Sequence, residues 1–158
     1  MSIKKVKPTV KSGFKQGYYK PKFPQKYRGE GPIIYRSSWE RKMCMYCDGK
    51  SDILKWSSEP IKIRYVSPID NKIHLYYPDF YMCVRQQDGS EIEYIVEVKP
   101  SKQLKKPKKP KRQTKKAMSN YRYAAKEYLK NNAKAIAAQA YAKEKGMKFI
   151  ILTEKTLK

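Results

Sequence analysis

Apolar positions recur along the chain with a helical period early and with an alternating period later. Trp39, Met43 and Tyr46 recur at a spacing of four and three residues, which places them on one stripe of a helix. Ser37 precedes this stripe and is a good N-cap. The pattern therefore predicts a helix that begins near Ser37, buries this stripe and ends at the Asp-Gly-Lys-Ser stretch of 48–51.

Three strands are expected after this helix. Residues 61–66 alternate apolar and basic side chains, as a half-exposed strand does. A turn at 67–72 then leads into a longer apolar segment, 73–84. An Asp-Gly turn at 88–89 and a further apolar segment at 92–98 predict a hairpin between the second and third strands.

An alanine-rich segment, 114–145, predicts a long helix, and Gly146 is a typical stop signal after it. The apolar, β-branched segment 147–153 is expected to return to the same sheet as a fourth strand by a crossover. The expected order is helix, three strands, helix, strand. At 158 residues the chain is expected to form one domain with tails.

Charge narrows the class of partner. Lysine and arginine number 37 against 14 acidic residues, which gives a formal net charge of +23. Such an excess makes the compact state self-repelling and favours a polyanionic partner, nucleic acid first and an anionic membrane surface second. The sequence has neither an apolar run of about 18 residues nor an apolar signal core near its start, so we expect no membrane span and no secretion.

Two segments concentrate the positive charge. Residues 1–30 hold nine basic residues and one acid without a hydrophobic period, which indicates an extended basic arm before a domain at 31–158. Its aromatic residues favour docking onto the body or onto nucleic acid, although the first dozen residues also fit a solvated tail. The loop at 100–116 is rich in lysine and proline and predicts an extended basic strap. Its candidate DNA contacts are Lys102, Lys105, Lys106, Lys108, Lys109, Lys111 and Arg112.

Three cysteines are too few for a disulfide framework. A zinc site formed by Cys44, Cys47, Cys83 and His74 is an alternative. Its geometry is unfavourable, because His74 and Cys83 lie an odd number of residues apart in one expected strand and so point to opposite faces. A Cys-x-x-Cys within a helix more often supplies two small core residues.

Two lone carboxylates interrupt apolar strands. Asp79 follows Pro78, which interrupts strand pairing, and Glu97 and Lys99 flank Val98 on one face of the third strand. The hairpin can bring Asp79 beside that face, where two converging carboxylates would repel each other unless a divalent cation lay between them. Mg²⁺ prefers such oxygen ligands. The alternative is an ordinary Glu–Lys pair on a hydrated face.

Glu40 is a third candidate carboxylate, on the first helix. Ser37 and Glu40 fit a capping box, in which Glu40 would bond the backbone at Ser37. A capping role and a position near the metal are both open, and neither excludes the other.

These residues resemble a known superfamily. Pro78-Asp79, then Glu97-Val98-Lys99, with a glutamate on the preceding helix, is similar to the pattern of the PD-(D/E)XK nucleases. More narrowly, 27–152 resembles the head completion nucleases of T4-like tailed phages and is also similar to transposon-end endonucleases. The resemblance implies an α/β fold with a central mixed four-stranded sheet flanked by helices.

The resemblance also implies roles for individual residues. Asp79, Glu97 and the backbone carbonyl of Val98 would bind one or two Mg²⁺ ions, for which Mn²⁺ can substitute, and Glu40 would complete the metal site. Lys99 would lie beside the scissile phosphate, so the catalytic set is Glu40, Asp79, Glu97 and Lys99. The loop at 100–116 is not part of the superfamily core and takes no role from it.

The expected function is therefore Mg²⁺-dependent DNA endonuclease activity in phage head completion before tail attachment. The expected partners are DNA and head, portal or neck proteins, with no membrane and no small-molecule cofactor, and the expected location is the virion after synthesis in the host cytoplasm. The alternative is a non-enzymatic basic nucleic-acid-binding or virion structural protein, for which charge alone explains affinity.

Overall fold

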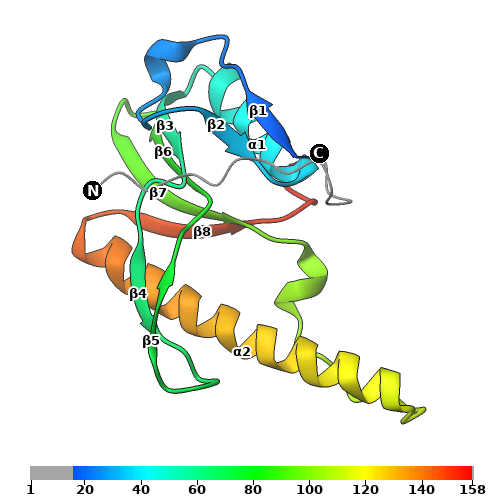
Figure 1. Ribbon diagram of the computed structural model, residues 1–158. Coiled ribbons are helices and arrows are strands. Elements are labelled where there is room, and N and C mark those ends of the chain that lie inside the picture. The colour runs from blue at the N-terminus through cyan, green and yellow to red at the C-terminus, as the bar shows by residue number, and fades with distance from the viewer. Residues whose placement is uncertain (1–15, 158) are drawn as a thin grey trace.

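A computed structural model describes residues 16–157 (Figure 1). Its elements are, in chain order, β1 (Gly17–Tyr19), η1 (Pro24–Lys26), β2 (Ile33–Tyr35), α1 (Ser38–Gly49), β3 (Ile53–Ser58), β4 (Ile63–Val66), β5 (Ile73–Tyr76), β6 (Phe80–Arg85), β7 (Glu91–Val98), η2 (Ser101–Leu104), α2 (Lys115–Glu144) and β8 (Lys148–Leu152).

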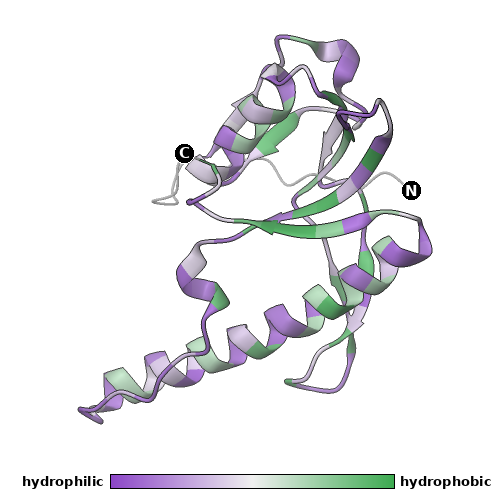
Figure 2. Ribbon diagram, turned by 180° about the vertical axis from the view of Figure 1, so that it is seen from behind, coloured by the Kyte–Doolittle hydropathy of each residue, from purple (hydrophilic) through white to green (hydrophobic). Residues whose placement is uncertain are grey.

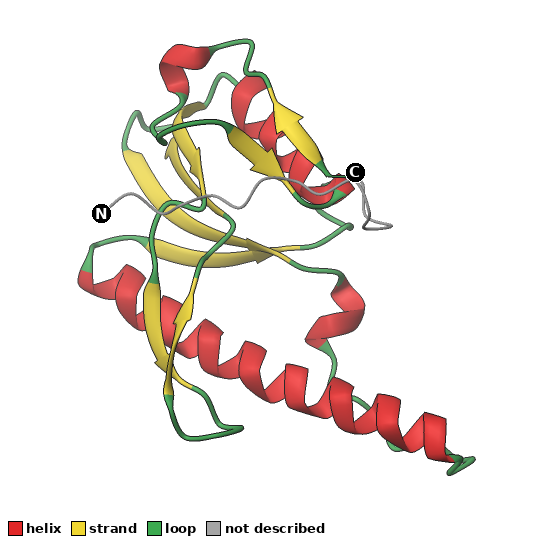
Figure 3. Ribbon diagram, viewed as in Figure 1, coloured by secondary structure: helices red, strands yellow, loops and turns green. Residues whose placement is uncertain are grey.

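The centre of the fold is a four-stranded mixed sheet in the order β3-β6-β7-β8. β6 pairs antiparallel with both β3 and β7, whereas β8 pairs parallel with β7 after the crossover through α2. Helices α1 and α2 lie on opposite sides of this sheet (Figure 3). The mixed α/β fold and the crossover of the last strand, both predicted from sequence, are confirmed.

Alternate residues of β7 serve the two sides of the sheet. Val96 is buried in the core with Met43 of α1, and Tyr94 and Val98 pack against the same core. Glu97 points to the other side, where it meets Tyr76 of β5. The period of two in a strand thus separates the apolar layer under α1 from the side of the sheet that carries the candidate chemistry. Hydrophobic residues follow the strands, while the loop between β7 and α2 is hydrophilic (Figure 2).

Helix α1 begins and ends as predicted, but its buried face differs. The Ser37 hydroxyl accepts a hydrogen bond from the Glu40 N–H at 3.1 Å, which confirms the N-cap. Met43, Cys44 and Cys47 face the core, whereas Tyr46 is 40% exposed, so the predicted stripe through Tyr46 is wrong. The small cysteines let the helix approach the sheet along their own face.

The first strand of the sheet is not the segment that the sequence predicts. It is β3, and the segment at 61–66 instead supplies β4, which pairs with β5 in a separate hairpin. β3 gives no alternating signal because it is buried on both faces, including Ser57 and Ser58 at 5% exposure each. The buried and exposed residues of β4 alternate, as they do in a strand with one solvent-exposed face, and this agrees with its place in a peripheral hairpin.

The expected long strand at 73–84 is broken into β5 and β6. The break falls at 77–79, around the buried Pro78, which has no N–H for a ladder bond. The proline is expected to interrupt pairing, and it also lets β5 leave the sheet.

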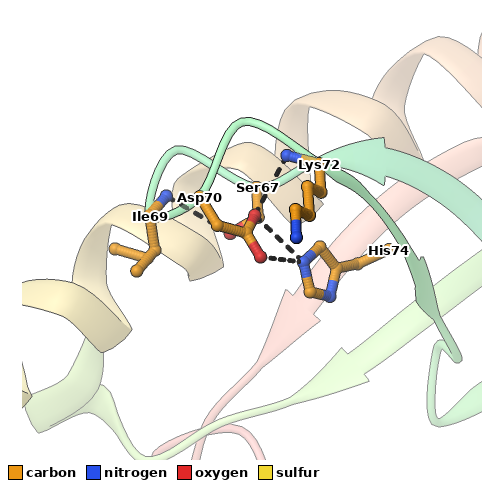
Figure 4. Close-up of polar contacts among 5 residues, drawn as sticks. All are labelled: Ser67, Ile69, Asp70, Lys72 and His74. Carbon is orange, nitrogen blue, oxygen red and sulfur yellow. Dashed lines mark hydrogen bonds and ion pairs between the residues drawn. The ribbon is translucent and has the colours of Figure 1, made fainter.

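The turn at 67–72 joins β4 to β5. The Asp70 carboxylate accepts a hydrogen bond from the Lys72 N–H at 3.0 Å and lies 2.8 Å from His74 Nε2. Figure 4 shows both contacts.

Helix α2 follows its predicted bounds closely. The Thr114 hydroxyl caps it by accepting from the Ala117 N–H, and Gly146 ends it with a φ of +70°. Ala138 is fully buried against Tyr65 and Tyr76 of the β4–β5 hairpin. The hairpin therefore packs on α2 and extends the molecule on the side of the sheet opposite to α1 (Figure 1).

The described part of the basic arm, 16–30, docks onto the body. Tyr19 and Tyr27 contact the ring of buried Trp56 edge-on, at centroid distances of 6.1 and 4.9 Å. The buried Asp48 carboxylate accepts hydrogen bonds from the Tyr19 hydroxyl and from two backbone N–H groups of the arm. Lys26 donates to three carbonyls at the end of α1, where a cation is favourable. Residues 1–15 of the arm lie outside the described residues.

The basic strap leaves the sheet at the end of β7. It begins with the 3₁₀ turn η2, which the sequence did not predict, and 105–114 then form no regular element before α2. It runs beside the N-terminal part of α2 (Figure 1). Residues of the strap and of α2 line an open pocket of about 600 Å³. Lys102, Lys105, Lys106 and Lys108 line this pocket, and all seven candidate DNA contacts of the strap are exposed.

The cysteines and the single histidine occupy different parts of the fold. Cys44 and Cys47 lie in the core under α1, Cys83 is buried on β6, and His74 lies on the exposed β4–β5 hairpin beside Asp70. The Cys-x-x-Cys pair thus supplies small core residues. Separately, none of the helices between residues 16 and 157 combines the length and the apolar character needed to cross a membrane.

Candidate active site

The pairing of β6 with β7 brings two carboxylates together. Phe80 pairs with Val96, and continuing this antiparallel register by one residue sets Asp79 opposite Glu97. Asp79 Oδ2 accepts a hydrogen bond from the Val98 N–H at 2.8 Å, which fixes its carboxylate at the end of β7. The register thus places Asp79 where the hairpin argument from sequence expected it.

Glu97 is a buried carboxylate with a partner for each oxygen. Its side chain is 9% exposed. Lys99 Nζ lies 2.9 Å from Oε1, and the Tyr76 hydroxyl donates to Oε2. The Lys99 contact confirms that residues 97 and 99 share one face of the chain. Burial, followed by the negative charge of Glu97, raises the pKa of Tyr76, so this phenol stays protonated and remains a donor.

The surroundings of Asp79 disfavour the charged form of its carboxylate. Burial first and the negative charge of Glu97 second raise the pKa of Asp79 well above its ordinary value, and Glu40 raises it further. The Val98 N–H and the positive charge of Lys99 oppose this shift without cancelling it. The two strand carboxylates therefore repel each other in the protein alone, which is the condition that a bound cation relieves.

Glu40 lies in the same neighbourhood, but its carboxylate is held by the backbone N–H of Arg36. Its carboxylate accepts from the Arg36 N–H at 2.8 Å, so the reciprocal half of the expected capping box runs to Arg36 and not to Ser37. Burial raises the pKa of Glu40, with smaller contributions from Glu59 and Glu97, while Arg36 opposes the shift. Glu40 is thus close enough to Glu97 for their charges to interact, while its carboxylate caps the start of α1 through the Arg36 N–H.

Several groups at this site were not identified from the sequence. Tyr76 binds Glu97, and Arg36 pairs through its guanidinium with Glu59, whose backbone N–H donates to the Asp79 carbonyl at 2.8 Å. Glu59 adopts a φ of +46°, an uncommon conformation for a non-glycine residue. No local motif marks these residues, because each reaches the site from a different element. Glu59 precedes Pro60, and this order indicates only that the backbone at residue 59 is restricted.

The strap residues predicted to contact DNA start next to this site. Lys102 lies in η2, three residues after Lys99, and the remaining strap lysines continue along α2 away from the sheet. The structure therefore joins the carboxylate pair and the basic strap through the end of β7.

Two comparisons relate this chain to known nucleases. A family model for the TnsA-like endonuclease N-terminal domain matches residues 50–154, which include Asp79, Glu97 and Lys99. The chain belongs to this family. It is also 35% identical over 143 residues to the head completion nuclease of Enterobacteria phage T4, an alignment that covers 90% of this chain and 93% of that protein. The resemblance stated from the sequence is confirmed.

The chemistry of the donor set fits a hard divalent cation. The carboxylates of Asp79 and Glu97 and the carbonyl of Val98 offer oxygen ligands of the kind that Mg²⁺ prefers. Between residues 16 and 157, no group of three or more His, Cys, Asp or Glu side chains is arranged to hold a metal ion together. A cation at this position would thus take two carboxylates, the carbonyl and water, which is a usual Mg²⁺ environment.

The repulsion between the two carboxylates generates a stability prediction. Asp79→Asn keeps an oxygen for the Val98 N–H and removes one charge. In EDTA at pH 7–8 we expect the free energy of unfolding to rise by on the order of 1 kcal/mol, because a buried charge and its repulsion from Glu97 are removed. Because the folded-state pKa of Asp79 is raised, the gain should fade as the pH falls towards about 4.

Urea unfolding at several pH values measures this gain. Asp52→Asn, at an exposed carboxylate in the turn before β3, is the control and should change stability little. A loss of stability in Asp79→Asn at pH 8 would show that the carboxylate is favourable where it lies.

Proposed function

We propose that this protein is a Mg²⁺-dependent DNA endonuclease of the PD-(D/E)XK type. The observation that supports this proposal is the convergence of Asp79 and Glu97, with Lys99, at the ends of two paired strands in a chain of an endonuclease family. The sheet order and the helix before β3 are consistent with the core that the superfamily resemblance implies.

Asp79, Glu97 and the Val98 carbonyl would hold the cation, with Glu40 supporting the site from α1. When bound, the cation would supply an activated water and would neutralise charge on the phosphate and the leaving oxygen. Lys99 would place its ammonium beside the scissile phosphate and stabilise the negative charge that develops there. Glu97 lies on β7 and the Val98 N–H holds Asp79 directly before β6, so little reorganisation would be needed.

The basic strap would hold the DNA next to this site. Its lysines extend from the end of β7 along α2, and phosphate contacts of this kind bind without reading base sequence. Affinity would then come from the strap and selectivity for a cleavage position from the site.

By analogy with the T4 relative, named as a head completion nuclease, we propose a role in completing filled phage heads before tail attachment. The proposed partners are DNA and head, portal or neck proteins, and the proposed location is the virion. The high positive charge is consistent with work on packaged DNA.

The competing function is a non-enzymatic DNA-binding or virion structural protein. The net charge of +23 by itself explains an affinity for DNA, with or without cleavage. It requires binding that is independent of Mg²⁺ and no strand cleavage, and it gives no reason for a repelling carboxylate pair beside Lys99.

The decisive experiment incubates linear and circular DNA with the protein in Mg²⁺ or in EDTA. We expect cleavage in Mg²⁺ only, and a decrease of about two orders of magnitude or more in Asp79→Asn and Glu97→Gln, because both carboxylates act on charge in the transition state. Glu91→Gln, at an exposed position on the same strand, should cleave normally. Wild-type cleavage by both site variants would show that Asp79 and Glu97 are not the catalytic carboxylates, whereas no cleavage by the unaltered protein would favour the structural alternative.

Glu40→Gln tests the role of the helix glutamate. Glutamine retains an oxygen for the Arg36 N–H, so the cap and the stability should persist. If Glu40 supports the cation, cleavage should drop by about 10- to 100-fold, the usual effect of a supporting residue around a metal. Thermal melts and cleavage rates at several Mg²⁺ concentrations separate the two roles, and unchanged cleavage would make Glu40 a cap only.

The strap is tested by changing four lysines to glutamine. We expect weaker binding on unrelated DNA sequences and a log–log salt slope that shrinks by about 0.9 for each phosphate that the variant no longer neutralises. Cleavage at saturating DNA and low salt should change much less. The residues to change are Lys105, Lys106, Lys108 and Lys109.

A charge-matched control replaces four exposed lysines from the C-terminal part of the chain, namely Lys143, Lys145, Lys148 and Lys155. If both four-site variants show the same salt slope as the unaltered protein, the strap is a solvated loop whose charges only aid solubility.

A further inference from the structure

A second lysine reaches towards the site from α2. Lys134 lies near the middle of this helix and is partly buried. Its ammonium lies 5.8 Å from the ring centroid of Tyr65 on β4 and 5.6 Å from that of Tyr76 on β5. The β4–β5 hairpin thus provides an aromatic platform under the positive charge, a favourable arrangement for a cation.

Tyr76 links this lysine to the carboxylate site. One end of the phenol carries the hydroxyl that donates to Glu97, and the ring lies under the Lys134 ammonium. Lys134 and Glu97 therefore contact the same residue, Tyr76, on the same side of the sheet. Lys99, which pairs with Glu97, is the second cation in this region.

The charge on Lys134 is poorly compensated within the protein. Burial lowers the pKa of Lys134, and the positive charge of Lys99 is the next contribution in the same direction. Glu97 and Glu127 raise it only partly, and Lys130 lowers it. Within the part of the chain that the structure describes, no carboxylate lies within 4.0 Å of Lys134 Nζ, and Glu127 pairs instead with Lys130 at 2.6 Å.

An ammonium group that is partly buried without a carboxylate partner is costly unless an anion from outside pairs with it. A carboxylate of the protein does not fill this role for Lys134. A phosphate from outside can, because its oxygens accept several charge-assisted hydrogen bonds at once.

We propose that Lys134 and Lys99 form a phosphate-binding site for the DNA backbone, with Tyr65 and Tyr76 as the platform that positions Lys134. Identifying the anion as DNA rests on the proposed function. The site lies on the α2 side of the sheet, so DNA that reaches Glu97 passes between the end of β7 and the hairpin. Lys134 then contacts substrate, and Tyr76 acts as a positioning residue for both Lys134 and Glu97.

The test compares three variants on helix α2. Lys134→Met keeps an unbranched side chain on the tyrosine rings and removes the charge, whereas Lys134→Arg keeps the charge. Lys143→Met is the matched control, because Lys143 is exposed and nine residues further on, which places it on the opposite side of the helix. The probe is a fluorescent 20-base-pair duplex in EDTA, titrated by anisotropy at several salt concentrations.

We expect Lys134→Met to weaken duplex binding by about tenfold and to reduce the salt slope by about 0.9, the value for one phosphate contact. Lys134→Arg should stay within about threefold of the unaltered protein, because it retains the charge. Lys143→Met should change neither quantity by a comparable amount. Melting temperatures of Lys134→Met should be equal to or above those of the unaltered protein, since a poorly compensated cation has been removed.

Equal affinity and salt slope for Lys134→Met and Lys143→Met would overturn the proposal. A lower melting temperature of Lys134→Met with unchanged DNA binding would likewise overturn it and assign the lysine to packing on the tyrosines. Binding in EDTA does not depend on cleavage, so the result stands apart from the fate of the nuclease proposal. In Mg²⁺, a rise in KM that exceeds the fall in kcat is the further result expected of a substrate contact.

Discussion

Burial of the Glu97 carboxylate is the constraint to which the surrounding structure responds. A carboxylate taken out of water is costly unless each oxygen finds a donor or a cation. Lys99 and Tyr76 supply these partners from the end of β7 and from β5. The strand breaks at 77–79 around Pro78, so β5 leaves the sheet, packs with β4 on α2 and places the Tyr76 hydroxyl on Glu97.

Asp79 makes the same site unfavourable in the absence of a cation. The β6–β7 register sets it opposite Glu97, and the Val98 N–H holds it there. A protein selected for stability alone has no reason to keep two repelling carboxylates beside each other. Their retention is understandable in a site that binds a cation, because the repulsion is then exchanged for coordination.

The distribution of positive charge complements this small acidic centre. Lysines lie along the strap, at the end of β7 and on α2, on the side of the sheet that carries Glu97. The opposite side is closed by α1 and by the docked segment at 16–30, which packs on Trp56 and caps the end of α1. The side that carries Glu97 thus also carries the lysines of the strap, of the end of β7 and of α2, which favours contact with a polyanion there.

The sequence by itself determined the elements with strong local signals. The Ser37 cap, the Gly146 stop, the Asp-Gly turn and the apolar segments on either side of it predicted both helices and the β6–β7 hairpin, and the hairpin argument indicated that Asp79 lies beside the face of Glu97 and Lys99. These signals are local because capping, turn geometry and strand period depend on neighbouring residues only. Only the tertiary structure decided that 61–66 pairs in a separate hairpin, that β3 takes its place in the sheet, that Tyr76 reaches Glu97 and that Lys134 lies over the Tyr76 ring. Those outcomes depend on burial against segments distant in the chain, and β3, buried on both faces with two serines, carries no period that a single sequence reveals.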